Sequence, residues 1–114
     1  MFYSREEIEL TLNLYSIAKV HLNDLERKQL INGESNATNF EKNCYHYYSY
    51  IINIVHSWIN TLLPDEAEII QKRIIDKNTF DFIAIQLGYA NHSSVIRKNK
   101  NILNKLSLQE IQEC

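Results

Sequence analysis

The stretch Thr79-Phe-Asp-Phe-Ile-Ala-Ile-Gln-Leu-Gly-Tyr-Ala-Asn-His-Ser-Ser-Val-Ile-Arg-Lys-Asn-Lys100 determines how the C-terminal part of this chain folds. Ala84 is small, so a second helix can cross closely over the helix that carries it. Gly88 follows four residues later and can take the left-handed conformation that ends a helix without Cβ strain. We therefore predict two short helices joined by a tight turn, which is the arrangement of a helix-turn-helix motif.

The helix after this turn should be amphipathic, with Asn91 as its N-cap and an end near Leu106. Its apolar side carries Val95, Asn99, Ile102 and Leu106, with Ile96 and Leu103 beside them. Its opposite side presents Ser93, Ser94, Arg97, Asn101 and Asn104, flanked by Lys98, Lys100 and Lys105.

These polar side chains match the chemistry of a DNA major groove, because arginine can bind guanine bidentately and asparagine can bind adenine. The candidate base readers are Arg97, Asn101, Ser93 and Ser94. The candidates for phosphate contact are Lys98, Lys100, Asn104 and Lys105. The alternative is an ordinary solvated helix face, but the preceding turn favours DNA.

Charge is unevenly distributed along the 114 residues, although the net charge is only −2. Residues 1–87 contain 8 Lys or Arg and 12 Asp or Glu, a balance of −4. Residues 88–106 contain 4 basic residues and no acid, a balance of +4, and Glu110 and Glu113 then add −2. A basic stripe on an acidic body is the electrostatic pattern of a local DNA contact.

The rest of the chain reads as helices, because two Gly and one Pro leave few interruptions. Ser4 and Glu7 form a predicted capping box for a first helix that runs to about Ile31. Its apolar stripe holds Ile8, Leu12, Tyr15, Leu22 and Leu25, and Leu10, Leu14 and Ile17 widen that stripe, which indicates burial on more than one side.

A second long helix is expected from about Asn39 to Leu62, after a polar loop. Its core-facing residues should be Phe40, Cys44, Tyr47, Ile51, Val55, Trp58 and Leu62. Pro64 should begin a third helix with acids in its first turn and with Ala67, Ile70 and Ile74 facing inward. Residues 76–78 should break that helix, with Asn78 or Thr79 capping the next, and residues 107–110 suggest a further short helix or tail.

The predicted fold is therefore all-α. Residues 1–62 would form an N-terminal helical pair that supplies core and a possible oligomer contact. Residues 63–114 would form a tri-helical DNA-binding region around the helix-turn-helix motif.

The segments Leu63-Pro-Asp-Glu-Ala-Glu-Ile-Ile-Gln-Lys-Arg-Ile-Ile, Thr79-Phe-Asp-Phe-Ile-Ala-Ile-Gln-Leu-Gly-Tyr and Val95-Ile-Arg-Lys resemble the fourth region of bacterial sigma factors. The chain looks more closely like the small phage regulators of the ArpU and RinA type. The resemblance covers about residues 62–106. It implies a DNA-binding activator of phage or prophage late genes, in which the second helix of the motif reads a promoter.

Two features depart from that pattern. The stretch from Gly88 to Val95 is one residue longer than the commonest form of the motif, which affects the register of base contacts. Phe82 and Ile85 occupy a side of their helix that is usually polar. Packing against the N-terminal helices is the favoured interpretation of these two residues, and a partner surface is the alternative.

Two other functions fit the same sequence. One is a DNA-recognition protein of a phage packaging machine. The other is a protein-binding module that engages RNA polymerase or another regulator, for which Phe82, Ile85 and the acidic N-terminal body are the clues.

An aromatic cluster in the second helix could stack single-stranded bases or form core and an oligomer interface. Its members are Tyr45, Tyr47, Tyr48, Tyr50 and Trp58. No basic residue lies between Lys42 and Lys72, so structural use is favoured. A homodimer through the N-terminal helices is one hypothesis that follows.

The sequence contains no motif for catalysis or for a cofactor, since it lacks a glycine-rich phosphate loop and a nucleophile elbow. His46 and His56 lie on different helix faces and make no metal spacing with Cys44. Two cysteines form no disulfide framework, and neither a signal peptide nor a membrane-spanning stretch is recognisable. We expect a non-enzymatic, metal-free, cytoplasmic protein.

Overall fold

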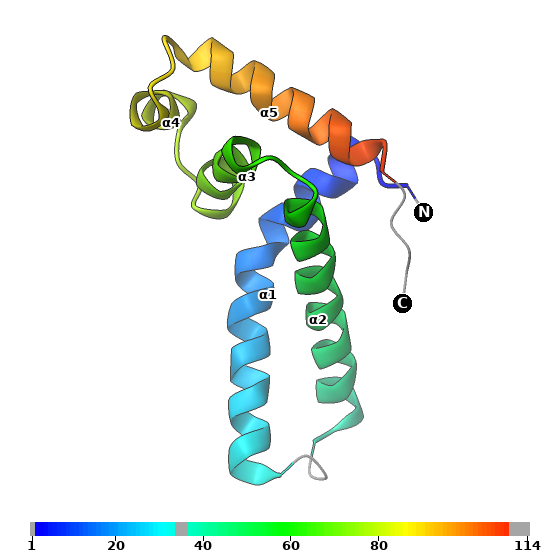
Figure 1. The fold of residues 1–114 in the computed structure, drawn as a ribbon. Helices are drawn as coiled ribbons and strands as arrows, with labels where there is room; N and C mark the ends of the chain where they lie inside the picture. The colour runs from blue at the N-terminus through cyan, green and yellow to red at the C-terminus, as the bar shows by residue number, and fades with distance from the viewer. Residues whose placement is uncertain (1, 34–36, 110–114) are drawn as a thin grey trace.

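A computed structural model describes residues 2–33 and 37–109, and over these ranges the chain contains helices and no strand. The all-α prediction is therefore confirmed. The elements, shown in Figure 1, are α1 (Arg5–Asn32), α2 (Asn39–Asn60), α3 (Pro64–Ile70), the π-helical turn η2 (Gln71–Ile75), α4 (Phe80–Leu87) and α5 (His92–Ser107).

Both long helices begin at capping boxes. The Ser4 hydroxyl accepts a hydrogen bond from the Glu7 amide at 3.1 Å, and the Glu7 carboxylate accepts one from the Ser4 amide at 3.0 Å, as predicted. Thr38 and Glu41 repeat this arrangement at the start of α2. Each box satisfies two backbone donors that a helix start leaves free. Gly33 ends α1 with a positive φ of 81°.

The helices α1 and α2 form an antiparallel hairpin whose core occupies only the end that adjoins the other helices (Figure 1). The buried residues of the pair are Ile8, Leu12, Tyr15 and Ala18 from α1 and Ile51, Ile54, Val55 and Trp58 from α2. Within residues 19–33 and 37–50 no side chain is fully buried. The hairpin therefore continues as an arm outside the core.

Several residues predicted to face the core are on the surface of this hairpin. Leu10 and Ile17 of α1 are exposed, and so are Phe40 and Tyr47 of α2. Apolar spacing identifies a stripe on a helix, but burial also requires a neighbour at that height along the axis. The helix α5 and the turn η2 contact α1 at one end of the hairpin, and no other described helix covers the arm.

The third helix begins with Pro64 at its first turn, and the Glu66 carboxylate accepts a hydrogen bond from the Leu63 amide at 2.9 Å. Ile69, Ile70 and Ile74 are buried, whereas Ala67, predicted to face inward, is only half-buried.

The helix continues through η2 and ends just before the predicted break, where the Asn78 amide bonds to the Lys72 carbonyl at 2.9 Å. Lys77 has a positive φ of 59°, and Thr79 caps α4. The wide hydrogen bonds of η2 thus turn the chain toward α4.

The helix α4 packs on α5 and η2, and it does not reach the N-terminal hairpin to any large extent. Phe82 is 46% exposed and Ile85 is 79% exposed. The interpretation that these two side chains pack against the N-terminal helices is therefore wrong, because α5 and η2 lie where the hairpin was expected. Ile83 and Ala84 are the residues of α4 that enter the core.

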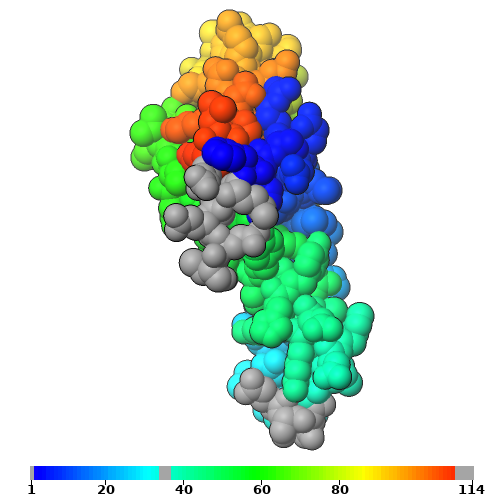
Figure 2. Space-filling model, turned by 90° about the vertical axis from the view of Figure 1, so that its right-hand side faces the viewer, coloured from blue at the N-terminus to red at the C-terminus, as the bar shows by residue number. Residues whose placement is uncertain are grey.

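The molecule measures 55 × 30 × 20 Å, and the arm accounts for its length. Figure 2 shows the arm as a narrow extension below a wider body that carries α5. Among the described residues, neither long helix has an apolar stretch sufficient to cross a lipid bilayer.

Candidate nucleic-acid interface

The turn between α4 and α5 has the predicted geometry. Gly88 adopts a left-handed conformation, with φ 77° and ψ 24°, and the Tyr89 amide bonds to the Ala84 carbonyl at 2.9 Å. Apart from Gly88 and its two chain neighbours, no heavy atom of the described residues lies within 4 Å of the position that a Cβ would take on Gly88. The backbone conformation alone therefore favours glycine here.

The next helix starts where Asn91 caps it, as predicted. The Asn91 side-chain oxygen accepts a hydrogen bond from the Ser94 amide at 3.2 Å. Ala84 is buried against this region, and Val95 in the first turn of α5 is fully buried. The crossing of α4 and α5 thus depends on a small residue at position 84, and it orients the exposed side of α5.

The faces of α5 divide as its sequence predicts. Val95, Ile102, Leu103 and Leu106 are buried. The predicted contact residues that are exposed are Ser93, Arg97, Lys100, Asn101 and Asn104. Ser94, Lys98 and Lys105 are half-buried. The structure therefore places five of the eight predicted contact residues along one exposed ridge of α5, the helix that Figure 1 shows at the end of the molecule opposite the tip of the arm.

Two of the four basic residues on α5 form ion pairs with α3. The Lys98 ammonium lies 2.6 Å from an Asp65 carboxylate oxygen, and the Lys105 ammonium lies 2.9 Å from Glu66. The hydrogen bond from Lys98 lowers the pKa of Asp65, and the same pair raises the pKa of Lys98. Lys98 and Lys105 therefore form ion pairs with acids of the protein itself.

The acids in the first turn of α3 suit the positive end of the helix dipole, and the structure gives Asp65 and Glu66 a second role. The pKa of Glu66 is lowered first by the Leu63 amide that donates to its carboxylate and then by Lys105. The carboxylates of Asp65 and Glu66 thus fasten α5 onto α3. They also leave Arg97 and Lys100 as the basic side chains of α5 without an ion pair among the described residues.

A cleft of about 370 Å³ borders α5 on the side of α1 and contains cations that the sequence did not connect with the site. Arg5 from α1 and Arg73 from η2 line it together with Lys100, and Glu6 and Glu9 add two acids. Arg5 is 95 residues away from Lys100 along the chain, so no local pattern could have linked them.

Two of the residues near the ridge are held by contacts within the protein. The Arg73 guanidinium lies 3.8 Å from the centre of the Phe80 ring and donates to the Asn78 carbonyl. His92 Nδ1 lies 2.9 Å from an Asp81 carboxylate oxygen at the start of α5. The second contact joins the first turns of α4 and α5, and nothing in the spacing of these residues predicts it.

The aromatic residues of α2 serve mainly structural roles. Trp58 is fully buried and meets the edge of the Tyr3 ring, and the Tyr3 and Tyr50 hydroxyls share a hydrogen bond. Tyr48 stacks on His21 with ring centres 5.1 Å apart. Tyr47 is exposed, and within the described part of the chain no cationic group lies over its ring.

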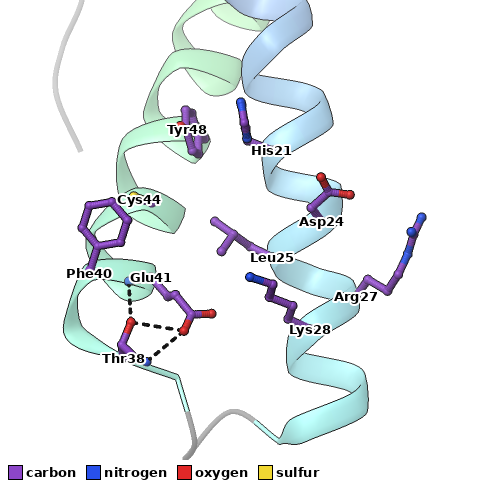
Figure 3. Close-up of a pocket in the computed structure, with 10 residues that line it drawn as sticks. All are labelled: His21, Asp24, Leu25, Arg27, Lys28, Thr38, Phe40, Glu41, Cys44 and Tyr48. Atoms are coloured by element: carbon purple, nitrogen blue, oxygen red, sulfur yellow. Dashed lines mark hydrogen bonds between the residues drawn. The ribbon is translucent and has the colours of Figure 1, made fainter.

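A groove of about 720 Å³ separates α1 and α2 in the arm, where Figure 3 shows Tyr48 and His21 facing each other across it. Leu25, Phe40 and Cys44 are the aliphatic, phenyl and thiol side chains among the residues that line the groove. The described part of the chain contains no cluster of three or more side chains able to hold a metal ion. The α5 ridge therefore remains the place where predicted contact residues converge.

Comparison of the chain with family models, with curated proteins and with solved structures finds no match.

Proposed function

We propose that this chain binds duplex DNA through the exposed ridge of α5 and regulates transcription from the bound site. The observation that carries the proposal is the geometry of the turn. A left-handed Gly88 and an Asn91 cap present one polar side of α5 to solvent, with Arg97 and Asn101 one helical turn apart. A helix of this kind fits the major groove.

We assign the α5 side chains to base or phosphate contact according to their exposure. Arg97, Asn101 and Ser93 would contact base edges, and Ser94 would do so less directly because it is half-buried beside its cap. Lys100 and Asn104 would contact phosphates. Residues 63–114 would thus form the DNA-binding unit, and residues 1–62 would supply core and a dimer contact.

The resemblance to small phage regulators narrows the proposed task to activation of phage or prophage late genes. It rests on the residues of the motif alone. The target would be a promoter, with RNA polymerase as a further partner.

The test is genome-wide mapping of bound DNA, followed by a gel shift on the enriched site at two salt concentrations. Arg97→Ala should weaken binding by about 1–3 kcal/mol and relax the preference at one base pair. Lys100→Ala should weaken binding to all sequences alike and flatten the salt dependence. Lys42→Ala on the arm is the matched control and should leave affinity unchanged.

Retention of wild-type affinity and wild-type base preference by the Arg97→Ala protein would contradict the assignment of α5 as the reading helix. Failure of the wild-type protein to shift any duplex would contradict DNA binding itself.

A second candidate function has one observation in its favour. Phe82 and Ile85 are exposed three residues apart on α4, the helix that precedes α5. Apolar side chains at such a place suit a protein partner, for which RNA polymerase or another regulator is the proposal. Ile85→Glu should then abolish co-purification with polymerase and leave the gel shift intact. An Ile85→Glu protein that still co-purifies with polymerase would exclude this surface.

A further inference from the structure

One face of α1 carries side chains at the spacing of a coiled-coil seam, and its charged members Asp24 and Arg27 also border the groove between α1 and α2. At intervals of three, four or seven residues it presents Leu10, Ile17, Val20, Asp24, Arg27 and Ile31, which we call the α1 seam. Such intervals keep residues on one side of a helix. The core residues Ile8, Leu12, Tyr15 and Ala18 lie on the opposite side of α1.

The apolar members of the seam have no cover among the described residues of this chain. Leu10, Ile17, Val20 and Ile31 are between 53% and 75% exposed. A shallow hollow of about 290 Å³, bordered by Ser16, Ile17, Val20 and His21, lies on the same face. Single exposed apolar residues are ordinary on a protein surface, whereas a row at coiled-coil spacing matches a helix-binding surface.

The side chains of the arm bury little of their surface within the described part of the chain. Residues 19–32 of α1 and 39–50 of α2 form a two-helix hairpin in which no side chain is fully buried. Two helices gain stability mainly by burying their apolar faces against further elements. A second hairpin laid against the first would supply that burial and give the arrangement of a helix bundle.

The charges in the α1 seam indicate which molecule covers the seam and whether its helix runs parallel or antiparallel to α1. Neither Asp24 nor Arg27 has an ion-pair partner among the described residues. A parallel pair of identical seams would place Asp24 against Asp24 and Arg27 against Arg27, and like charges in contact oppose association. An antiparallel pair centred between residues 25 and 26 places Asp24 of each copy against Arg27 of the other. In that register Val20 of each copy also meets Ile31 of the other.

We propose that two copies of this chain pair antiparallel through the α1 seam, with Asp24 of each copy against Arg27 of the second copy. The bodies that carry α5 then lie at opposite ends of the paired arms. This pairing does not depend on DNA binding, and its test contains no DNA.

The test is sedimentation equilibrium of the full chain across a wide concentration range. The wild-type protein should approach twice its chain mass of 13.5 kDa. Asp24→Arg and Arg27→Asp should each weaken the dimer by about tenfold or more, because each places like charges in contact. The double exchange D24R/R27D should restore wild-type dimerisation, and an equal mixture of the two single variants should form heterodimers.

Lys42→Glu, an equal change of charge on the neighbouring helix, is the control and should dimerise as the wild type does. Far-UV circular dichroism checks that each variant keeps its helix content. A wild-type protein that stays at 13.5 kDa throughout overturns the proposal. Single exchanges that leave the dimer unchanged overturn it as well, because a parallel seam or another surface would respond in that way.

Discussion

Replacing the two acids of α3 that hold α5 lysines should make DNA binding more sensitive to salt. In the wild-type protein Lys98 is paired with Asp65 and Lys105 with Glu66. The variant D65N/E66Q removes both carboxylate charges and releases both lysines toward phosphates. Asparagine and glutamine keep the size of the side chains, and the amide that replaces the Glu66 carboxylate can still accept the hydrogen bond of the Leu63 amide.

The expected magnitude follows from the number of cations available to phosphates. Each neutralised phosphate contributes about −0.9 to the slope of log K against log salt. Lys100, the one α5 cation that contacts phosphates in the proposed wild-type complex, gives a slope of about −0.9, and addition of Lys98 and Lys105 gives about −2.7. Between about 50 and 200 mM salt the affinity should thus fall about 3.5-fold for the wild type and about 40-fold for D65N/E66Q.

The assay is a fluorescence-anisotropy titration of a labelled duplex at several salt concentrations. Glu68→Gln is the matched control, because Glu68 is exposed on the same helix and has no ion-pair partner among the described residues. Its slope should equal that of the wild type. Equal slopes for the wild type and D65N/E66Q would refute the reasoning, since they would mean that the ion pairs do not limit the contacts of these lysines.

Three further predictions concern stability. Gly88→Ala should lower the free energy of unfolding in urea by about 1–2 kcal/mol, because the left-handed backbone is strained for alanine although the space is open. Gly88→Asn should lower it less, and an unchanged urea midpoint for both variants would contradict this reasoning. The pKa of Glu66 lies below its ordinary value of 4.5, so its stabilising contribution is complete above pH 4.5 and is lost as the pH falls through the lowered value. Thermal melts from neutral to acidic pH should therefore show a larger loss for the wild type than for Glu66→Gln, and parallel curves would exclude this role. Trp58→Ala should lower the free energy of unfolding by about 3–5 kcal/mol. Trp58→Phe should lower it clearly less, because the buried indole N–H has no hydrogen-bond partner among the described residues. Equal losses for the two variants in urea unfolding would argue against that explanation.

Features that depend on neighbouring residues were predictable from the sequence. Ser4 and Glu7 cap the first helix as expected, Pro64 begins the third, and Gly88 and Asn91 form the turn before α5. Each of these signals works through the backbone within a few residues, so no knowledge of the rest of the fold is required. The two faces of α5 were predictable for the same reason, since helical spacing alone separates Val95 and Ile102 from Arg97 and Asn101.

Features that depend on distant elements were not predictable. Phe40 and Tyr47 have the spacing of core residues, yet they are exposed because no described helix covers the arm. Phe82 and Ile85 were expected to pack on the N-terminal helices, which α4 does not reach to any large extent.

Local sequence signals established that the chain is helical, where its caps and turn lie, and which side of α5 is polar. All of these properties follow from periods of three to four residues and from local hydrogen bonds. Tertiary packing settled which stripes are buried, that Asp65 and Glu66 occupy two of the α5 lysines, and that Arg5 lines the same cleft as Lys100. The residues in these pairs are 33 to 95 positions apart in the sequence, and only the packing of whole helices brings such residues near one another.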